Sequence, residues 1–360
     1  MSRPLKALIN PAAINTNIER VRHHVPGRKI IAVVKADAYG HGLRATLAGS
    51  SSADAFAVTS IEEAVQVREI DQKRPVILLE GFFEPQELEL VERFRLWPIL
   101  HSEEQLAQLC RARVRSKIHV WIKYDSGMNR LGFRDQELHN ALNRVASVGH
   151  VTVRGIASHF SSADDVLSEV TSIQYKKIKH IESIGLELST ANSAAIFTGT
   201  TFPNEWVRPG IAIYGCSPIP DRSAEDLGLT PAMTMLSSVI SIRHCQTGDA
   251  VGYGATWTCP EAMRVGVVAG GYADGYPRHA PAGTPVLVEG RRAPLIGRVC
   301  MDMLMVDLRD HPSAHVGSPV MLWGEGLLVA EVAERAGTIP AELLARVNAR
   351  VPREIVEPSS

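Results

Sequence analysis

The stretch "AVVKADAYGHG", residues 32–42, sets the pattern from which the fold can be inferred. Ala32, Val33 and Val34 are typical of the end of a buried strand. Lys35 follows where a strand would leave the core, although lysine is rarely buried without a partner. A polar loop containing Gly40 comes next. The stretch therefore predicts a strand whose end presents a lysine to a tight loop, and this placement needs a chemical explanation.

The same alternation of apolar runs and polar loops continues through the first two-thirds of the chain. Segments with helical periodicity lie between most of the apolar runs, which are "KIIAVV", "DAFAVT", "PVILLEG", "WPILHS", "KIHVWIKY", "VTVRGIAS", "GLELSTA" and "IAIYG". Eight strands alternating with helices over about 215 residues fit a closed (β/α)8 barrel of the TIM type better than an open sheet. The predicted fold class is therefore α/β.

Helix starts are marked by capping residues. Asn10 and Pro11 suit the cap and first turn of a helix whose apolar stripe is Ile14, Ile18, Val21 and Val25. Ser60–Glu63 and Ser102–Gln105 have the spacing of capping boxes, which predicts two further helix starts.

The pattern changes near Thr230 and Pro231, where strand-like runs follow one another with glycine and proline turns and little helix. We therefore expect two domains, a barrel over residues 1–230 and a mainly β domain over residues 231–360. One short helix, "AELLARVNA", is expected near the end.

Composition excludes several classes of function. The 360 residues carry a formal net charge of −1, with 45% hydrophobic and 21% charged residues, as in ordinary soluble enzymes. Neither a nucleic-acid partner nor a membrane partner is expected, because the chain has no basic patch and no apolar run of roughly 20 residues. The five cysteines form no CxxC pair and no zinc spacing, so no metal site is expected. The N-terminus lacks the apolar core of a signal peptide, and we expect a cytoplasmic protein.

Polar residues follow several of the predicted barrel strands, where the chemistry of such barrels gathers. They are Lys35, Lys123, Asp125, Arg130, His159, Asn192, Ser193, Arg208 and Gly210. Each alone is more often structural than catalytic. Together they favour a site, because one rim of the barrel would receive them all.

The chemistry of Lys35 points to a cofactor. A lysine amine at the mouth of an apolar strand can act as a nucleophile, and covalent binding of pyridoxal phosphate (PLP) is the leading use of such a lysine. Tyr39, Ser193 and backbone N–H groups near Gly210 would provide hydrogen-bond donors for the phosphate, since late loops of such barrels often bind phosphate.

These residues carry a resemblance to a known family. "AVVKADAYGHG" resembles the PLP-attachment signature of the alanine racemase family, and the likeness continues in order over nearly the whole chain. It includes "KYDSGMNRLGF", "SHF", "NSAA", "WVRPGIAIYG", "VGYGATW", "GYADGYPRHA", "GRVCMDMLMVDL" and "RVPR". The family fold is a PLP-binding barrel followed by a β domain, which agrees with the pattern above.

The resemblance implies an L-/D-alanine racemase with two bases on opposite faces of the substrate. Lys35 would bind PLP and serve one face. Tyr253, from the second subunit of a homodimer, would serve the other. Arg208 would face the pyridine nitrogen, and His159 with Arg208 would form a relay that supports the tyrosine.

The resemblance assigns further residues to the cofactor and the substrate. Arg130 would bind the substrate carboxylate, braced by Lys123, which is carbamylated in many family members. Tyr272, Met301 and Asp302 would approach the substrate from the partner subunit, although Tyr272, Asp302 and Cys300 would also suit interface packing. The residues that would hold PLP and its phosphate are Tyr39, His159, Asn192, Ser193, Arg208, Gly210 and Ile211.

One position departs from the family pattern. Family members usually carry a tyrosine where "GTIPAELLARV" has Ala341, and that ring contacts the phosphate and crowds the substrate pocket. Its loss predicts either a wider substrate range, with serine as the first candidate, or a gap that another side chain fills.

Other readings stay open at this stage. PLP-dependent decarboxylases of basic amino acids share the architecture, and Cys300 would suit them, although "GYGATW" and "GYADGYPR" fit the racemase better. A PLP carrier protein would resemble the barrel alone. The sequence does not separate a biosynthetic from a catabolic role.

Overall fold

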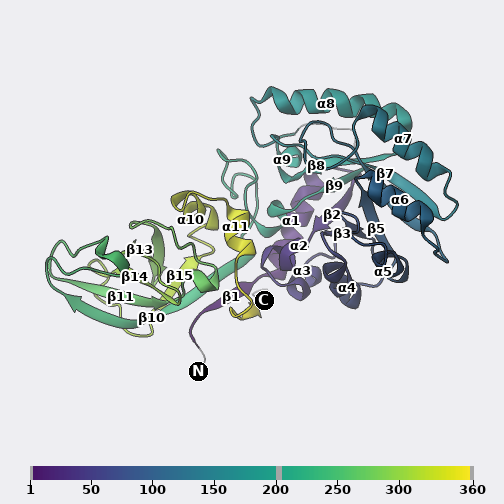
Figure 1. The fold of residues 1–360 in the computed structure, drawn as a ribbon. Coiled ribbons are helices and arrows are strands. Elements are labelled where there is room, and N and C mark those ends of the chain that lie inside the picture. The colour runs from purple at the N-terminus through teal and green to yellow at the C-terminus, as the bar shows by residue number, and fades with distance from the viewer. Residues whose placement is uncertain (1–2, 200–204, 357–360) are drawn as a thin grey trace.

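The computed structural model describes residues 3–199 and 205–356, which form a closed barrel beside a β domain (Figure 1). The short helices α10 (Val329–Arg335) and α11 (Pro340–Ala345) lie between the two units. No helix of the described ranges is long and apolar enough to cross a membrane. The predicted α/β class, with a TIM-type barrel and a mainly β domain, is confirmed.

Eight parallel strands close the barrel, and each pairs with the next in chain order until the last returns to the first. Short apolar runs form these strands because both of their faces are covered by side chains. The barrel strands are β2 (Lys29–Val33), β3 (Ala55–Val58), β4 (Val76–Leu78), β5 (Leu96–Leu100), β6 (Ile118–Lys123), β7 (Val151–Ala157), β8 (Glu187–Asn192) and β9 (Trp206–Arg208).

Helices cover the outside of the barrel and begin where the capping residues predict. The side chain of Asn10 accepts a hydrogen bond from the N–H of Ala13, and Ser60 and Ser102 cap their helices in the same way. The barrel helices are α1 (Pro11–His24), α3 (Leu43–Ala48), α4 (Ile61–Ile70), α5 (Glu87–Arg93), α6 (Glu103–Arg111), α7 (Asp135–Ala146), α8 (Glu169–Ile181) with the short η1 (Glu182–Ile184), and α9 (Ser193–Phe197).

The eighth strand corrects one sequence prediction. The run "IAIYG" is not a strand, because Ile211–Tyr214 form the short 3-10 helix η2, and the strand is the preceding β9. Ala212, Ile213 and Tyr214 are fully buried. A short apolar run that is buried on all sides does not distinguish strand from helix by its pattern, which explains the error.

The β domain is built on one eight-stranded sheet in the order β11-β14-β13-β12-β15-β10-β1-β16. The first strand of the chain belongs to this sheet, where it pairs antiparallel with β10 and parallel with β16. The domain limits at residue 230 stay a prediction. The structure adds that β1, at the start of the chain, lies in the sheet of the β domain and not in the barrel. The elements are β1 (Lys6–Ile9), β10 (Met233–Cys245), η3 (Tyr253–Ala255), β11 (Met263–Ala269), η4 (Tyr272–Asp274), β12 (Pro285–Val288), β13 (Arg291–Ile296), β14 (Met303–Asp307), β15 (Pro319–Trp323) and β16 (Arg353–Ile355).

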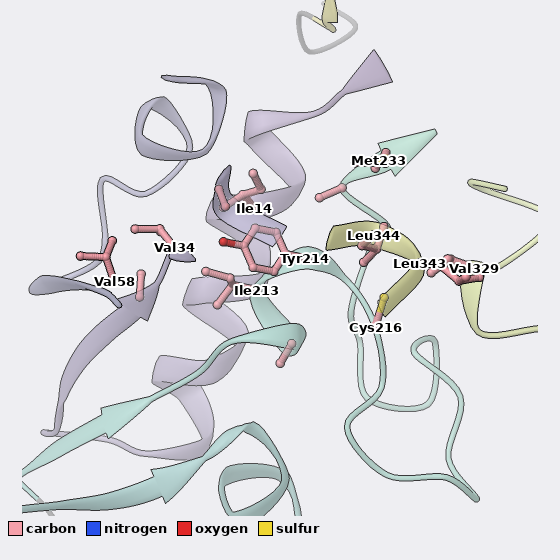
Figure 2. Packing of buried hydrophobic residues seen from close by; sticks show 14 of the residues in the cluster. Ile14, Val34, Val58, Ile213, Tyr214, Cys216, Met233, Val329, Leu343 and Leu344 are labelled. Carbon is pink, nitrogen blue, oxygen red and sulfur yellow. The ribbon is translucent and has the colours of Figure 1, made fainter. Parts of the chain in front are cut away.

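One hydrophobic core runs through the junction of the two units. Figure 2 shows Tyr214 between the barrel residue Val34 and the α11 residue Leu344. The hydroxyl of Tyr214 donates to the carbonyl of Val33 at 3.0 Å, so this buried ring is also anchored to the end of β2. The end of β2, directly before Lys35, is therefore packed into the junction of the two units.

Candidate active site

A cavity of about 430 Å³ opens at the carboxyl ends of the barrel strands. This is the end at which barrel enzymes place their chemistry. Ten of the residues singled out in the sequence line this one cavity: Lys35, Tyr39, Lys123, Arg130, His159, Asn192, Ser193, Arg208, Gly210 and Ile211. Ala341 of α11 lines it as well, so the β domain contributes to its wall.

Lys35 begins a short left-handed turn, the segment labelled α2 (Lys35–Tyr39). The φ angles of Ala36, Asp37, Ala38 and Tyr39 are 55°, 49°, 55° and 51°, in a region that residues other than glycine rarely adopt. At about 1–2 kcal/mol for each residue, the turn is strained by roughly 4–8 kcal/mol. The carboxylate of Glu63 accepts a hydrogen bond of 2.6 Å from the N–H of Ala36 and helps to hold the turn.

Arg208 is buried at the centre of the cavity floor and is held by a set of fixed acceptors. Its guanidinium donates to the carbonyl and hydroxyl of Ser189, at 2.5 and 2.7 Å, and to the carbonyl of Ser158. Burial and the charge of Arg130 lower the pKa of Arg208 to about 10, so it stays a cation at neutral pH. One Nη atom lies 3.3 Å from Nδ1 of His159.

Burial and like charges lower the pKa values of two other titratable groups of the cavity, His159 and Lys123. Burial, and then the charges of Arg208, Lys123, Arg130 and Lys35, hold the pKa of His159 well below its usual range. The Nε2 atom of the same ring lies 3.5 Å from the amide nitrogen of Asn192. Burial, followed by Arg208 and Arg130, likewise holds the pKa of Lys123 well below its usual range.

A cradle of hydroxyl and backbone groups lies beside Lys35. The N–H of Gly210 donates to the Ser193 hydroxyl at 2.9 Å, which brings these two groups together. A Cβ at Gly210 would lie 2.7 Å from the hydroxyl of Tyr39, so a side chain there would displace that hydroxyl. The hydroxyls of Tyr39 and Ser193 and the N–H of Gly210 thus converge on a space that a larger residue at position 210 would fill.

Four residues singled out in the sequence lie in the β domain and are not among the lining of this cavity. Tyr272 and Met301–Asp302 lie on adjacent loops, since the N–H of Tyr272 donates to the carbonyl of Cys300 at 3.0 Å. The side chains of Tyr253, Tyr272 and Met301 are 65%, 40% and 51% exposed. These three residues are therefore accessible on the surface of the single chain.

A buried ion cluster fixes two of these loops. The carboxylate of Asp274 is fully buried and receives both Nη atoms of Arg3, at 2.5 and 2.7 Å, and Nε of Arg350 at 2.7 Å. Arg350 also donates to Asp302 at 2.7 Å, and the N–H of Gly271 donates to Asp274. The turn that carries Tyr272 and the loop that carries Asp302 are therefore tied to each other.

Sequence reasoning missed part of the cavity wall, which also includes Leu79, Glu80, Leu131, Asp164 and Pro218. Leu79 and Glu80 directly follow β4, so the strand-end rule that found Lys35 would have found them too. Glu63 and Arg353 were also missed. Both act on the left-handed turn from outside the cavity, and although the capping box Ser60–Glu63 and the "RVPR" motif contain them, neither motif indicates that role.

Comparison with known proteins agrees with this geometry. Residues 9–218 match the family model of the alanine racemase N-terminal domain, and residues 232–355 match that of the alanine racemase C-terminal domain. The two matches divide the chain at the junction between the barrel and the β domain.

Relatives that match over nearly their full length are also named alanine racemases. An alanine racemase of Nitrosomonas eutropha is 47% identical over 98% of this chain and 99% of its own length. A catabolic alanine racemase of Pseudomonas putida is 46% identical with the same coverage. The crystal structure of the biosynthetic alanine racemase from Pseudomonas aeruginosa superposes with a TM-score of 0.95 at 45% identity, covering 99% of this chain and 100% of the other. The chain therefore belongs to the alanine racemase family.

Proposed function

We propose that this chain is a PLP-dependent alanine racemase, which interconverts L- and D-alanine as a homodimer with shared active sites. The observation that carries the proposal is the gathering of ten sequence-predicted residues around one cavity at the barrel mouth. The full-length likeness to proteins named alanine racemase supports the same activity.

The cavity fits PLP by the chemistry of its walls. Lys35 offers an amine for covalent attachment, and the cradle of Tyr39, Ser193 and Gly210 offers hydroxyl and backbone groups for a phosphate. Arg208 offers a fixed donor for the pyridine nitrogen. PLP, when bound, supplies the electron sink that makes the α-proton of an amino acid removable.

The residues of the chain then divide the proton transfers between them. Lys35 takes or returns the proton on one face of the α-carbon, and Tyr253 of the partner subunit serves the opposite face. Arg208 keeps its own proton at neutral pH, so it would donate to the ring nitrogen of the cofactor without protonating it. His159 stays neutral, as its lowered pKa requires, and links Arg208 to the rim.

Arg130 and Lys123 form the substrate-anchoring part of the proposal. Arg130 lies at the rim, where its guanidinium suits a substrate carboxylate. The lowered pKa of Lys123 favours the neutral amine, which is the form that reacts with carbon dioxide to give a carbamate. The resulting anion would pair with Arg130, so labelled bicarbonate should give a carbamate signal that a Lys123→Ala variant lacks.

A chiral product assay tests the function directly. The PLP-loaded protein is incubated separately with L-alanine, L-serine, L-lysine and L-arginine, and D-product, amine and carbon dioxide are measured. D-alanine is the expected product. Amine with carbon dioxide from lysine or arginine would favour the decarboxylase reading instead, and absence of any D-product would reject the racemase.

Two variants test the assigned bases. Lys35→Ala should lose covalent PLP, which is read as failure of borohydride to fix the cofactor to the protein. Tyr253→Phe should keep covalent PLP but lose racemisation by roughly 100-fold or more, because a positioned acid–base group contributes about 10²–10⁴-fold. Lys176→Ala and Tyr175→Phe, on α8 and away from the cavity, serve as matched controls.

A second, wider activity rests on Ala341. This residue, Ile211, Pro218 and Asp164 line both the active-site cavity and an adjoining cavity of about 950 Å³. The two cavities therefore meet where the family tyrosine would stand. We infer that side chains larger than that of alanine, serine first, are accepted there.

Restoring the ring tests this wider activity. Ala341→Tyr should lower the ratio of serine to alanine turnover, by roughly 10-fold if the ring closes the gap. Ala341→Ser keeps the position small and should leave the ratio as it is. An equal ratio in both variants would reject the wider range while leaving the alanine racemase assignment intact.

A further inference from the structure

We propose that Arg353, at the start of β16, is a positioning residue that sets the left-handed turn after Lys35. The inference rests on the proposed PLP-dependent function. It concerns a residue of the β domain that touches neither the cavity nor the cofactor. Through one side chain, the docking of the second domain would determine how well the barrel binds its cofactor.

The turn places two cavity residues at once, and its local hydrogen bonds include those from the N–H of Ala38 to the carbonyl of Val34 and from the N–H of Gly42 to the carbonyl of Asp37. Lys35 stands at its start and Tyr39 at its end, and both line the cavity. Within the turn, the N–H of Gly40 donates to the carbonyl of Ala36. Four consecutive residues in a strained conformation persist only where the surroundings over-determine them. The question is therefore which outside contacts hold the turn.

Besides Glu63, Arg353 of the β domain contacts the turn. Its Nε donates to the carbonyl of Gly40 at 3.0 Å, and one Nη lies 3.6 Å from the carboxylate of Asp37. The rest of the guanidinium is fixed within its own segment by donation to the carbonyls of Val347, Asn348 and Val351. The side chain is only 17% exposed. Because four hydrogen bonds fix the guanidinium, the fork is rigid and holds the turn in one place.

The backbone of the β-domain segment also fits the turn closely. A Cβ at Gly40 would lie 2.0 Å from the carbonyl oxygen of Leu344 in α11. Arg353 and Leu344 therefore press on the same point of the turn from one segment. No side chain separates the backbone of Gly40 from that of Leu344, so a shift of the β-domain segment moves Gly40 directly. The five residues of fixed backbone from Ala36 to Gly40 then transmit the shift to Lys35.

The test compares cofactor binding in matched variants. Arg353→Gln removes the fork, and PLP titrated into the apoprotein should bind about 10-fold or more weakly. Borohydride trapping of PLP on Lys35 should slow in parallel, because displacement of a reacting group by about 1 Å can cost as much as 100-fold. Arg353→Lys keeps the charge near Asp37 without the fork and should give an intermediate affinity.

Two further variants separate positioning from general stability. Arg346→Gln lies seven positions earlier in the same segment, where the arginine is exposed and pairs with Glu342 of its own helix, so PLP affinity should not change. Asp37→Asn removes the ion pair while its oxygen still accepts from the N–H of Leu43, and PLP should bind about two- to fivefold more weakly.

Two results would overturn the inference. One is equal PLP affinity and trapping rate in Arg353→Gln and Arg346→Gln. The other is wild-type PLP affinity in both Arg353→Lys and Asp37→Asn, which would mean that neither the fork on Gly40 nor the pair with Asp37 positions the turn. If the wild-type protein itself neither binds PLP nor racemises alanine, the proposed function fails rather than the role of Arg353.

Discussion

At the scale of single residues, the most constrained side chain of the site is Arg208. Its planar fork meets acceptors on two different strands, the Ser189 groups of β8 and the Ser158 carbonyl after β7. A lysine has the same charge but no fork, so it cannot satisfy these acceptors together. Arg208 therefore stabilises the fold by joining these two segments, in addition to its proposed contact with the cofactor.

We predict that Arg208→Lys lowers the free energy of unfolding of the apoprotein by about 2–3 kcal/mol, because at least one buried acceptor loses its donor. Denaturant titration of the apoprotein measures this without the cofactor. The exposed Arg346→Lys exchange is the control and should change stability by less than about 0.5 kcal/mol. Equal stability of both variants would mean that the fork is not needed.

Asp274 gives a second prediction at this scale, on acid stability. Burial alone would raise the pKa of this carboxyl, but hydrogen bonds from Arg3, Arg350 and the N–H of Gly271 outweigh it and lower the pKa. A lowered native pKa means that the stabilisation is complete above the unfolded value of about 3.9 and is lost as the pH falls through the native value.

Asp274→Asn should therefore lose about 3–5 kcal/mol of unfolding free energy at neutral pH, since two arginines lose a buried partner. Below about pH 4 the difference from the wild type should shrink, because the wild-type carboxyl is then protonated as well. Unfolding at a series of pH values measures both effects. The exposed Asp310→Asn variant should show neither effect. A difference in unfolding free energy between Asp274→Asn and the wild type that does not change with pH would contradict this explanation.

At the scale of elements, the left-handed turn shows where sequence reasoning stops. Apolar runs, strand-end polar residues and the caps at Asn10, Ser60 and Ser102 predicted the barrel and most of its cavity. The conformation of Ala36–Tyr39 was not predictable, because alanine and tyrosine prefer right-handed backbone. It is imposed by Glu63, by Arg353 and by packing of α11, and each of these contacts is distant in sequence. The wrong prediction of a strand for "IAIYG" has a similar cause, because burial in the junction of the two units determines the conformation of this run.

Glycine substitutions test the packing of this element. Gly40 and Gly27 both have positive φ, 75° and 76°, but a Cβ at Gly27 meets nothing within 4 Å. Gly27→Ala should cost about 1–2 kcal/mol for its backbone conformation alone. Gly40→Ala should cost a further 1–3 kcal/mol or so, because the methyl group overlaps the Leu344 carbonyl. Thermal unfolding compares the two, and equal losses would mean that α11 does not press on the turn.

At the scale of the whole molecule, the proposed dimer predicts that two inactive proteins restore activity when mixed. A Lys35→Ala chain retains Tyr253, and a Tyr253→Phe chain retains Lys35. In a mixed dimer one of the two sites would hold both intact residues. After dissociation and reassociation of equal amounts, about a quarter of wild-type activity should return, because half of the dimers are mixed and each has one complete site.

The same experiment identifies the source of the tyrosine. If Tyr253 served the site of its own chain, a mixed dimer would contain no complete site and no activity would return. Mixing each variant with itself, under the same dissociation protocol, controls for activity recovered by refolding alone.

The place of β1 in the far sheet has a consequence for how the protein is made. Ala7 pairs with Met235 and Arg353, so the first strand to leave the ribosome finds its neighbours only after more than two hundred further residues. At roughly 5–20 residues per second, that wait lasts on the order of tens of seconds. During it the barrel can close while Lys6–Ile9 stays an unpaired edge. The β domain is thus completed only at the end of translation, and a gene fragment coding for residues 231–360 would lack an inner strand of its own sheet.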